Sequence, residues 1–558
     1  CQERNKNATL SCGKGGVSFL SLHYTNPANA IASWQGLYLM PTAFIAAYQL
    51  SRELEQFLVE APNSVVVEDG EVLFEFSTAH YAVSGEGKTV LHFWSEGRNT
   101  VRRVLDAERK GRVLRLSVLR FGQSQPTVLE ICADADRRTA ASQRAIRARY
   151  QRLLERVLLR QYPGAKIEHL SSKPDLEHTF SPIYTRVVLR MGQLSVAVLG
   201  ANAAETQAAI DASLSFGILW MDYQRQRLAG RTHVEGLKLF VPSGRAAVVR
   251  QRAAHLNHEA AKWQIFELDE RSESCEELDS ADTGNISTRL VHAVNTEAAR
   301  QRFAQSIACI RELAPAADIS VPSANEIVFR LYGLEFARAR MVTAPASVRN
   351  SETILFGLGP AEYVLDDATS GLFRELVQRV MQQRHPNGSS TNLFFRMCPE
   401  RWLENLIGRD VRVIDERLDA RYVYSQVPAF AASDRAMLDL LTSTLDGRLA
   451  ILELKVDEDI HLALQGLDYW ARVRWHQQHD DFVRHGYFAG RELSSQPPLL
   501  FLVAPALRVH PATDVLLRYL SPRIDWCLVR VDERWRQQLQ VVNKRRAAAS
   551  SFQVLPDA

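Results

Sequence analysis

Cysteine is scarce in this sequence and shows no paired spacing. The seven cysteines are scattered along 558 residues, and none belongs to a C-x-x-C pair. A disulfide framework or a structural zinc site is typically built from clustered cysteines, so neither is favoured here. We therefore expect a reducing, cytoplasmic location.

Long apolar runs and a strong net charge are also absent. The most apolar early stretch, residues 37–47, is interrupted by Pro41 and is shorter than the roughly 20 residues that span a bilayer. We expect no membrane span and see no basic-then-apolar signal pattern at the start. The net charge of +3 neither requires nor excludes a polyanionic partner. Only local charge patterns can therefore indicate one.

The chain is long enough for several domains, and its order of elements suggests a duplication. Residues 71–76 (EVLFEF) resemble residues 326–331 (EIVFRL) at an offset of about 255. A helical pattern precedes each stretch, over residues 44–58 and 298–313, and a second apolar strand follows each. This order predicts two related α+β modules.

The resemblance between the halves continues into two predicted β-hairpins. One covers residues 184–199 and turns at Gly192, whereas the other covers residues 436–452 and turns at Asp446-Gly447, a dipeptide that favours tight turns. After each hairpin we expect a helix, a strand, a second helix and a closing strand. The expected ranges are 203–227, 236–242, 245–256 and 263–268 in the first half, and 460–478, 499–505, 512–520 and 526–531 in the second.

We therefore predict a multidomain α/β and α+β protein with an internal duplication, in which an α+β module precedes an α/β module in each half. A chance likeness between two α/β segments is the alternative. Polar segments at 271–285 and 384–391 are the expected linkers. The expected parts are 1–35 (unassigned), 36–135 (α+β module), 136–270 (α/β module), 286–385 (second α+β module), 390–535 (second α/β module) and 536–558 (C-terminal tail).

Two acids and a lysine in the second hairpin are the main candidates for chemistry. Asp439 lies on its first strand, and Glu453 and Lys455 lie near the end of the second. Alternation along a strand puts Glu453 and Lys455 on the same face, and antiparallel pairing brings Asp439 close to Glu453. Two carboxylates placed so close are costly unless a cation lies between them. The pattern predicts a convergent acid-acid-lysine site.

Oxygen ligands of this kind suit Mg²⁺ or Mn²⁺, which keep several waters and accept phosphate oxygens. The metal would polarise a phosphodiester, and Lys455 would orient the attacking water and offset the developing negative charge. The alternative is an exposed strand edge that happens to end in Glu-Leu-Lys, since E-x-K alone recurs often by chance.

The order of these residues resembles the PD-(D/E)xK nuclease family, which includes restriction endonucleases and RecB-type exonucleases. The spacing from Asp439 to Glu453 and Lys455 is similar to that of archaeal NucS-like endonucleases, and Gln465 with Tyr469 matches the Q-x-x-x-Y element of the RecB branch. The resemblance covers roughly residues 398–532. It implies a restriction-endonuclease-like α/β/α core with a mixed sheet, a divalent metal, and hydrolysis of phosphodiester bonds, with DNA a better expected substrate than RNA.

The resemblance also implies roles for neighbouring residues. Gln465 and Tyr469, four residues apart on one helical face, would contact substrate or position the lysine, unless they only pack against a neighbouring element. Glu404 occupies the helical position at which many family members carry an extra acid near the metal. Glu400, one turn earlier, is the competing choice. Gln426 falls on the preceding strand, where related nucleases often carry a polar residue.

The first predicted α/β module lacks these residues. Between residues 184 and 201 there is no Asp, Glu or Lys, and alignment of Gly192 with Gly447 places Val198 at the position of Glu453 and Gly200 at that of Lys455. We expect a degenerate nuclease fold. Its helix over residues 137–160 carries eight arginines and one acid, which would suit contact with phosphates or, alternatively, a solvated helix.

Two further readings of the whole chain stay open at this point. The protein could be a non-catalytic nucleic-acid-binding or interaction scaffold that retained the fold. It could also be a subunit of a repair or defence complex that stays inactive until a protein partner arrives. An intact acid-acid-lysine set favours catalysis over a scaffold, because clustered carboxylates give a pure scaffold no advantage.

Overall fold

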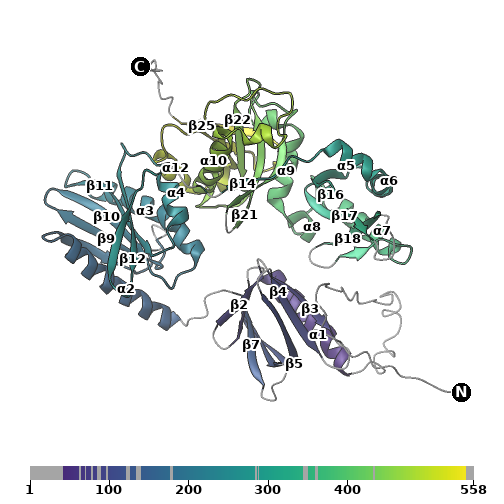
Figure 1. The fold of residues 1–558 in the computed structure, drawn as a ribbon, viewed down its shortest axis with the longest axis horizontal. Helices are drawn as coiled ribbons and strands as arrows, with labels where there is room; N and C mark the ends of the chain where they lie inside the picture. Colours follow the sequence, from purple (N-terminus) through teal and green to yellow (C-terminus); the bar gives the residue numbers. More distant parts are fainter. Residues whose placement is uncertain are drawn as a thin grey trace. The chain divides into compact units, whose positions relative to one another are not determined.

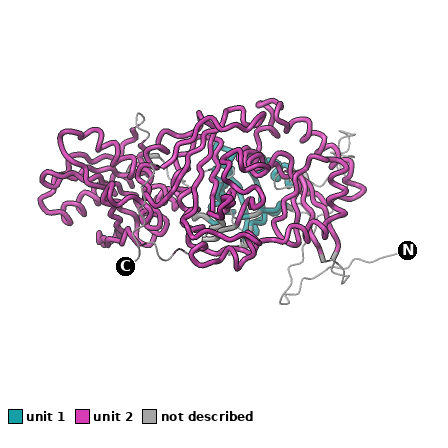
Figure 2. The backbone as a smooth tube through the Cα atoms, turned by 90° about the horizontal axis from the view of Figure 1, so that it is seen from above, with its two compact units in different colours: residues 1–140 teal, residues 141–558 magenta. Residues whose placement is uncertain are grey.

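The computed structural model describes most of the chain beyond the first 41 residues. The described ranges are 42–61, 64–68, 71–76, 79–84, 89–95, 98–120, 126–133, 140–175, 180–282, 286, 288–343, 350–358, 362–431 and 434–547. The unassigned segment 1–35 lies outside them. The chain separates into two compact units, 1–140 and 141–558, shown in different colours in Figure 2. Each unit is considered by itself.

The N-terminal unit consists of helix α1 (Thr42–Glu60) and one curved antiparallel sheet. Leu54 and Phe57 of the helix are buried in the same cluster as Leu91 and Phe93 of the sheet. The strand order is β2-β1-β7-β6-β5-β4-β3. The strands are β1 (Val65–Glu68), β2 (Glu71–Glu75), β3 (His80–Ser84), β4 (Val90–Ser95), β5 (Arg98–Lys110), β6 (Val113–Leu119) and β7 (Thr127–Cys132).

The second unit begins with an α/β module built on a mixed sheet, which we call the first α/β module. Its strand order is β13-β12-β11-β10-β9-β8. The strands are β8 (Lys166–Ser171), β9 (Tyr184–Met191), β10 (Leu194–Ala201), β11 (His233–Pro242), β12 (Lys262–Asp269) and β13 (Ser274–Leu278). Its helices are α2 (Ala140–Gln161), α3 (Gln207–Arg227) and α4 (Ala247–Ala253).

An α+β part follows, which we call the meander module because its five strands pair in chain order. Its strands are β15 (Asp318–Ser323), β16 (Glu326–Leu331), β17 (Leu334–Thr343), β18 (Asn350–Phe356) and β19 (Tyr363–Val364). Its helices are α5 (Thr296–Arg302), α6 (Ala304–Leu313) and α7 (Ser370–Gln383). Phe303, Phe329, Phe336 and Phe373 fill its core.

The second α/β module carries the predicted site. Its strand order is β14-β20-β21-β22-β23-β24-β25. The strands are β14 (Thr288–Leu290), β20 (Tyr424–Ala431), β21 (Asp434–Ser443), β22 (Leu449–Leu454), β23 (Leu499–Pro505), β24 (Asp525–Val531) and β25 (Val541–Arg546). The helical elements are α8 (Leu393–Arg396), α9 (Pro399–Arg409), η3 (Val411–Val413), α10 (Leu462–Gln478), α11 (Asp481–Arg484), η4 (Ala506–Arg508) and α12 (Pro511–Arg518).

The two mixed sheets share their strand order and directions. In each, an antiparallel hairpin (β9–β10 or β21–β22) is followed by two parallel strands and a final antiparallel strand. A glycine of each first crossover helix lies close to the sheet: a Cβ on Gly217 would meet Leu237 at 2.7 Å, and one on Gly466 would meet Leu502 at 2.5 Å. A duplication would produce this correspondence.

The N-terminal unit and the meander module resemble each other over a shorter stretch of elements. Each begins with a helix and a hairpin, β1–β2 in one and β15–β16 in the other. After that the pairing differs, because β16 pairs with β17, whereas β2 is an edge strand of its sheet. The order of elements therefore agrees for the helix and first hairpin and differs in the rest of the sheet, and the repeat of the α+β modules stays a prediction.

The two α/β modules pack through equivalent elements. Helix α3 contacts α12, and α10 contacts α4. Leu256, just after α4, forms a β-bridge with Leu520, just after α12. The flanking backbone bonds are reciprocal: Asn257 donates to Tyr519 (2.8 Å) and Ser521 donates to His255 (2.9 Å). This is a local pseudo-two-fold arrangement, the symmetry of an isologous dimer within one chain.

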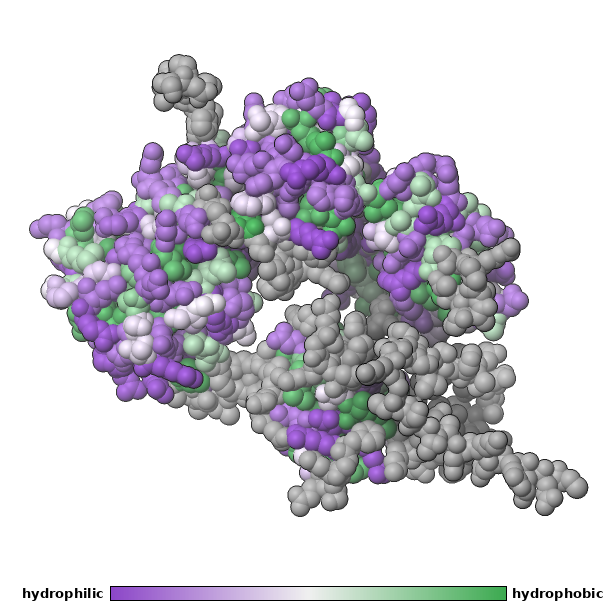
Figure 3. All heavy atoms as spheres, viewed as in Figure 1, coloured by the Kyte–Doolittle hydropathy of each residue, from purple (hydrophilic) through white to green (hydrophobic). Residues whose placement is uncertain are grey.

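One hydrophobic cluster runs through both α/β modules, so they share a core instead of having separate ones. Ile218 and Met221 of α3 are buried in it together with Leu467 of α10 and Leu516 of α12. In Figure 1 helices α3, α4, α10 and α12 lie between the two mixed sheets. On the visible face in Figure 3, hydrophilic side chains dominate the described surface of these modules, and apolar ones are scattered among them.

Two segments differ from the sequence-based expectation. The expected linker 271–285 contains β13, which pairs with β12, and the expected tail 536–558 contains β25, which pairs with β24. Both are polar edge strands, whose solvent-facing residues give little apolar signal. No helix among the described residues is both long and apolar enough to cross a membrane.

Candidate active site

Asp439, Glu453 and Lys455 come together where β21 and β22 lie side by side. The register pairs Leu440 with Leu452, which places Asp439 beside Glu453. The Asp439 carboxylate accepts a hydrogen bond from the backbone N–H of Leu454 at 3.0 Å. The Nζ of Lys455 lies 3.3 Å from Oε1 of Glu453. The predicted convergence of the three side chains is therefore present in the structure.

Burial raises the pKa of both acids, and like charge adds to the rise for Glu453. Glu453 is 2% exposed, and burial followed by the charge of Asp439 raises its pKa well above the usual value. Burial also raises the pKa of Asp439. Burial alone would lower the pKa of Lys455, but the attraction of Glu453, Glu400 and Asp439 outweighs it, so the net shift is upward. The acids around Lys455 therefore outnumber the one lysine that faces them.

A divalent cation fits this donor set. Oε2 of Glu453 is buried and has no hydrogen-bond partner among the described residues, although a buried carboxylate oxygen normally has one. The described part of the chain contains no group of three or more His, Cys, Asp or Glu side chains placed to hold a metal. The protein ligands would thus be the pair Asp439 and Glu453, as suits Mg²⁺, which is often held by one or two carboxylates and keeps several waters.

Helix α9 brings Glu404 to the edge of this cluster. Its Oε2 accepts hydrogen bonds from Arg401 (2.9 Å) and from the side-chain amide of Gln426 (2.8 Å). Burial raises the pKa of Glu404 to about 7, against the opposing effect of Arg401, and Asp439 adds to the rise. Glu404 and Gln426 therefore contact each other directly and lie within electrostatic reach of Asp439.

Gln426 has an unusual backbone for a strand residue. Its φ is 54°, in the left-handed region that non-glycine residues rarely adopt. Its neighbours Ser425 and Val427 pair with Leu440 and Leu438, so Gln426 lies opposite Asp439. Strained backbone of this kind is often kept where a side chain must be aimed at a site. Here it aims the amide of Gln426 at Glu404.

Glu400, the competing choice, also faces the cluster. Burial raises its pKa, and it interacts electrostatically with Lys455 and Asp439. Glu404 interacts with Asp439 and contacts Gln426. The structure brings both helical acids to the site, one turn apart, and does not select between them.

Gln465 and Tyr469 lie on α10, which packs on β22 and β23. Burial, then the charges of Glu453 and Asp439, raise the pKa of the Tyr469 hydroxyl, so this ring is near the acids. Oε1 of Gln465 is buried and lacks a hydrogen-bond partner among the described residues. Tyr469 is thus placed beside the acids, and Gln465 offers an acceptor to which no described residue donates.

One positioning residue, Arg384, was not foreseen. It lies in the segment expected to be a linker, yet it is fully buried, and its guanidinium donates to the carbonyls of Tyr332 (2.6 Å), Phe394 (2.6 Å) and Met397 (2.7 Å). It also stacks 4.7 Å from the Trp402 ring centroid. Arg384 therefore fixes the start of α9, the helix of Glu400 and Glu404. A single arginine in a polar segment gives no sequence signal for this role.

The first α/β module has a different set of residues at the matching place. Pro242 and Pro505 end the equivalent parallel strands, and counting from them places Leu199 at the position of Glu453. Arg186 then matches Asp439, because it pairs with Leu199. The expected alignment through the hairpin glycines was wrong by one residue, because two residues separate β9 from β10 but five separate β21 from β22.

No protein-family model matches this chain, and no curated protein sequence is significantly similar to it. The geometry of the second α/β module is therefore the main observation that bears on function. It consists of a mixed sheet, two adjacent acids, a lysine and two supporting acids on α9.

Proposed function

We propose that the second α/β module is a metal-dependent nuclease that hydrolyses phosphodiester bonds, in DNA more than in RNA. The observation that carries the proposal is the contact of Asp439, Glu453 and Lys455 at the end of β22, with one Glu453 oxygen buried and unpartnered among the described residues. Burial of two acids side by side lowers stability, and a functional reason to keep them there is that they can bind a cation and, through it, a phosphate. The resemblance to the PD-(D/E)xK pattern supports the same reading.

Each residue has a role in this proposal. Asp439 and Glu453 would hold Mg²⁺ or Mn²⁺, which when bound supplies Lewis acidity toward a phosphate oxygen. Lys455, held by Glu453, would donate a hydrogen bond to the attacking water or to the phosphate as negative charge grows. The backbone N–H of Leu454 fixes the Asp439 carboxylate, so this ligand is already oriented before a cation arrives.

The surrounding residues would tune and support the pair. Glu404, oriented by Arg401 and Gln426, would support the metal from α9, with Glu400 as the alternative. Tyr469 and Gln465 on α10 would contact the substrate backbone from the other side.

The test is incubation of purified protein with circular and linear DNA and with RNA, in Mg²⁺, in Mn²⁺ or in EDTA. We expect cleavage with either metal and none in EDTA. Lys455→Met and Glu453→Gln should each lower the rate about a hundredfold or more, as removal of one stabilising group from an active site commonly does. Leu199→Met, at the equivalent position of the first α/β module, is the matched control and should cleave like wild type.

Metal binding gives an independent readout. Titration with Mn²⁺ should raise the melting temperature of the wild-type protein, since a ligand that binds only the folded state stabilises it. The rise should be small or absent in Glu453→Gln. Cleavage that persists in both variants would remove the site assignment, and no cleavage of any substrate would favour a non-catalytic binding scaffold.

A further inference from the structure

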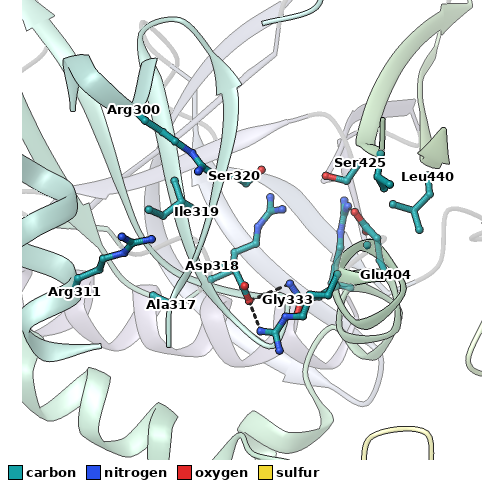
Figure 4. A pocket seen from close by; sticks show the side chains of 16 residues that line it. Arg300, Arg311, Ala317, Asp318, Ile319, Ser320, Gly333, Glu404, Ser425 and Leu440 are labelled. Carbon is teal, nitrogen blue, oxygen red and sulfur yellow. Dashed lines mark hydrogen bonds and ion pairs between the residues drawn. The ribbon is translucent and has the colours of Figure 1, made fainter. Parts of the chain in front are cut away.

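A cavity of about 340 Å³ lies between the meander module and the second α/β module. Figure 4 shows Arg300, Arg311 and Ser320 on one side of it and Glu404 and Ser425 on the other. The cavity therefore has Glu404 in common with the candidate active site. Ser425 and Leu440 also line it, and they are the chain neighbours of Gln426 and Asp439. It opens directly beside the catalytic cluster.

The lining is strongly basic. Five arginines face two carboxylates, and the arginines are Arg300, Arg311, Arg330, Arg401 and Arg409. Both carboxylates are already engaged: Asp318 accepts from Arg409 (2.8 Å) and from Asn405 (3.0 Å), and Glu404 accepts from Arg401. Two cationic groups are thus matched by protein anions.

Of the other three arginines, two form no ion pair within the described part of the chain and the third has only a long one. Arg300 and Arg311 form no ion pair there, and Arg330 comes no nearer than 3.9 Å to Glu335. Arg330 is half-buried, and burial together with the neighbouring Arg401 lowers its pKa. An anion in the cavity would compensate this charge. Guanidinium groups suit phosphate oxygens especially well, because their planar fork can donate two parallel hydrogen bonds.

The walls of the cavity are held together by direct contacts between the modules. The Asp318 carboxylate of β15 binds Arg409 and Asn405 of α9. The turn between β16 and β17 presses on the same helix, since a Cβ on Gly333 would lie 2.1 Å from the Arg401 carbonyl oxygen. These contacts fix β15 and the turn between β16 and β17 relative to α9, the helix of Glu404.

We propose that this cavity binds a backbone phosphate of the DNA strand that enters the active site, so that the meander module is a substrate clamp. This inference rests on the proposed nuclease function for the identity of the strand. A phosphate held by Arg300, Arg311 and Arg330 would fix the strand next to the bond to be cut. Positioning of this kind lowers the entropic cost of reaching the reactive geometry.

The test measures binding separately from cleavage. Fluorescein-labelled single-stranded and duplex DNA is titrated with protein in EDTA, over a series of salt concentrations, so that no strand is cut. Arg300→Gln/Arg311→Gln should raise Kd about tenfold in low salt. It should also reduce the slope of log Kd against log salt by about 0.7 to 0.9 for each phosphate that the variant no longer binds. Arg374→Gln, an exposed arginine on α7 outside the cavity, is the matched control.

The outcomes separate the two proposals. If wild type cleaves DNA but the double variant binds with the Kd and salt slope of Arg374→Gln, the clamp is wrong and the nuclease stands. If binding depends on the two arginines but no substrate is cleaved with any metal, the clamp stands and the nuclease is wrong. Because both arginines are exposed, the melting temperature should not change, and a large fall would overturn their assignment to ligand contact.

The source of the phosphate is resolved by further arms of the same experiment. Equal binding of 5′-phosphorylated and 5′-hydroxyl strands would identify an internal phosphate, whereas a preference for the phosphorylated strand that disappears in the double variant would identify a strand end. Both support the clamp. Arginine-dependent binding of dAMP or inorganic phosphate, with DNA binding unchanged in the double variant, would overturn it in favour of a free-nucleotide or phosphate site.

Discussion

The two α/β modules share a sheet order but differ at one strand end. In the second module, that place holds Asp439, Glu453 and Lys455. In the first, Leu199 and Ala201 are fully buried apolar residues there. Arg186 replaces the aspartate, and its guanidinium lies 5.1 Å from the Phe180 ring centroid and 5.8 Å from that of Trp220. A buried cation on aromatic rings repels a metal ion, so the first module cannot bind one at this place.

The comparison separates what the fold needs from what the site adds. The first module shows that this sheet packs well with an apolar strand end, so the acids of the second module are not required for folding. Burial raises the pKa of both acids, the charge of Asp439 raises that of Glu453 further, and one buried Glu453 oxygen has no partner among the described residues. Groups that cost stability and are dispensable for the fold are typical of functional sites.

The largest expected effect on stability comes from substitutions at two matched positions, Leu199 in the first α/β module and Glu453 in the second. Leu199→Glu replaces a fully buried leucine with a carboxyl group opposite Arg186 and should lower the free energy of unfolding by about 3 kcal/mol, because a buried ion pair is less favourable than well-packed apolar groups. Glu453→Gln removes a like charge and should raise it by about 1 kcal/mol in metal-free buffer. Chemical denaturation of both variants in EDTA measures the difference. Equal destabilisation by the two changes would contradict the idea that only the second module is destabilised by its acids.

The pH dependence of stability gives a smaller effect. Glu404 has its pKa raised by burial from 4.5 to about 7, so the folded state binds its proton more tightly than the unfolded state does. Its contribution to stability is therefore greatest below about pH 4.5 and is lost as the pH rises toward 7. Relative to wild type, Glu404→Gln should gain up to about 3 kcal/mol between pH 5 and pH 7.5 without metal.

The measurement is the unfolding free energy of both proteins across this pH range in EDTA. Glu155→Gln, on helix α2 of the first α/β module, is the control, and its difference from wild type should not change with pH. A constant difference between Glu404→Gln and wild type at every pH would contradict the assigned burial effect. With saturating Mn²⁺ the pH dependence should shrink, because a bound cation favours the ionised acids.

Substitution of two arginines on the basic helix α2 of the first module should have the smallest effect, a modest weakening of DNA binding. Arg147, Arg156 and Arg160 are paired with Glu205 or Glu273, whereas Arg149 and Arg152 line a separate cavity of about 1150 Å³ and form no ion pair within the described residues. Arg149→Gln/Arg152→Gln should weaken DNA binding only a few-fold, with a lower salt dependence. Fluorescence anisotropy at several salt concentrations measures this. Unchanged binding would leave α2 as a solvated helix.

Much of the local structure was predictable from the sequence. The strand expected at 499–505 is β23 with the same bounds, and the hairpins and crossover helices lie within a few residues of their expected ranges. Alternating or continuous apolar runs between turn residues carry this signal. The edge strands β13 and β25 were missed because their polar sequences look like linkers. Among the site residues, spacing and strand alternation brought together Asp439, Glu453 and Lys455, whereas Glu404 followed from the family resemblance.

The sequence by itself determined the elements and the order of the acid-acid-lysine set, because strand alternation and turn chemistry depend on near neighbours. Only the tertiary structure decided three other features: the shared core of the two α/β modules, the fixing of α9 by Arg384, and the arginine cavity beside Glu404. Burial, and the pKa shifts that follow from it, depend on which distant segments pack together. The charge a side chain carries in the site is therefore set by the fold and not by its neighbours in the chain.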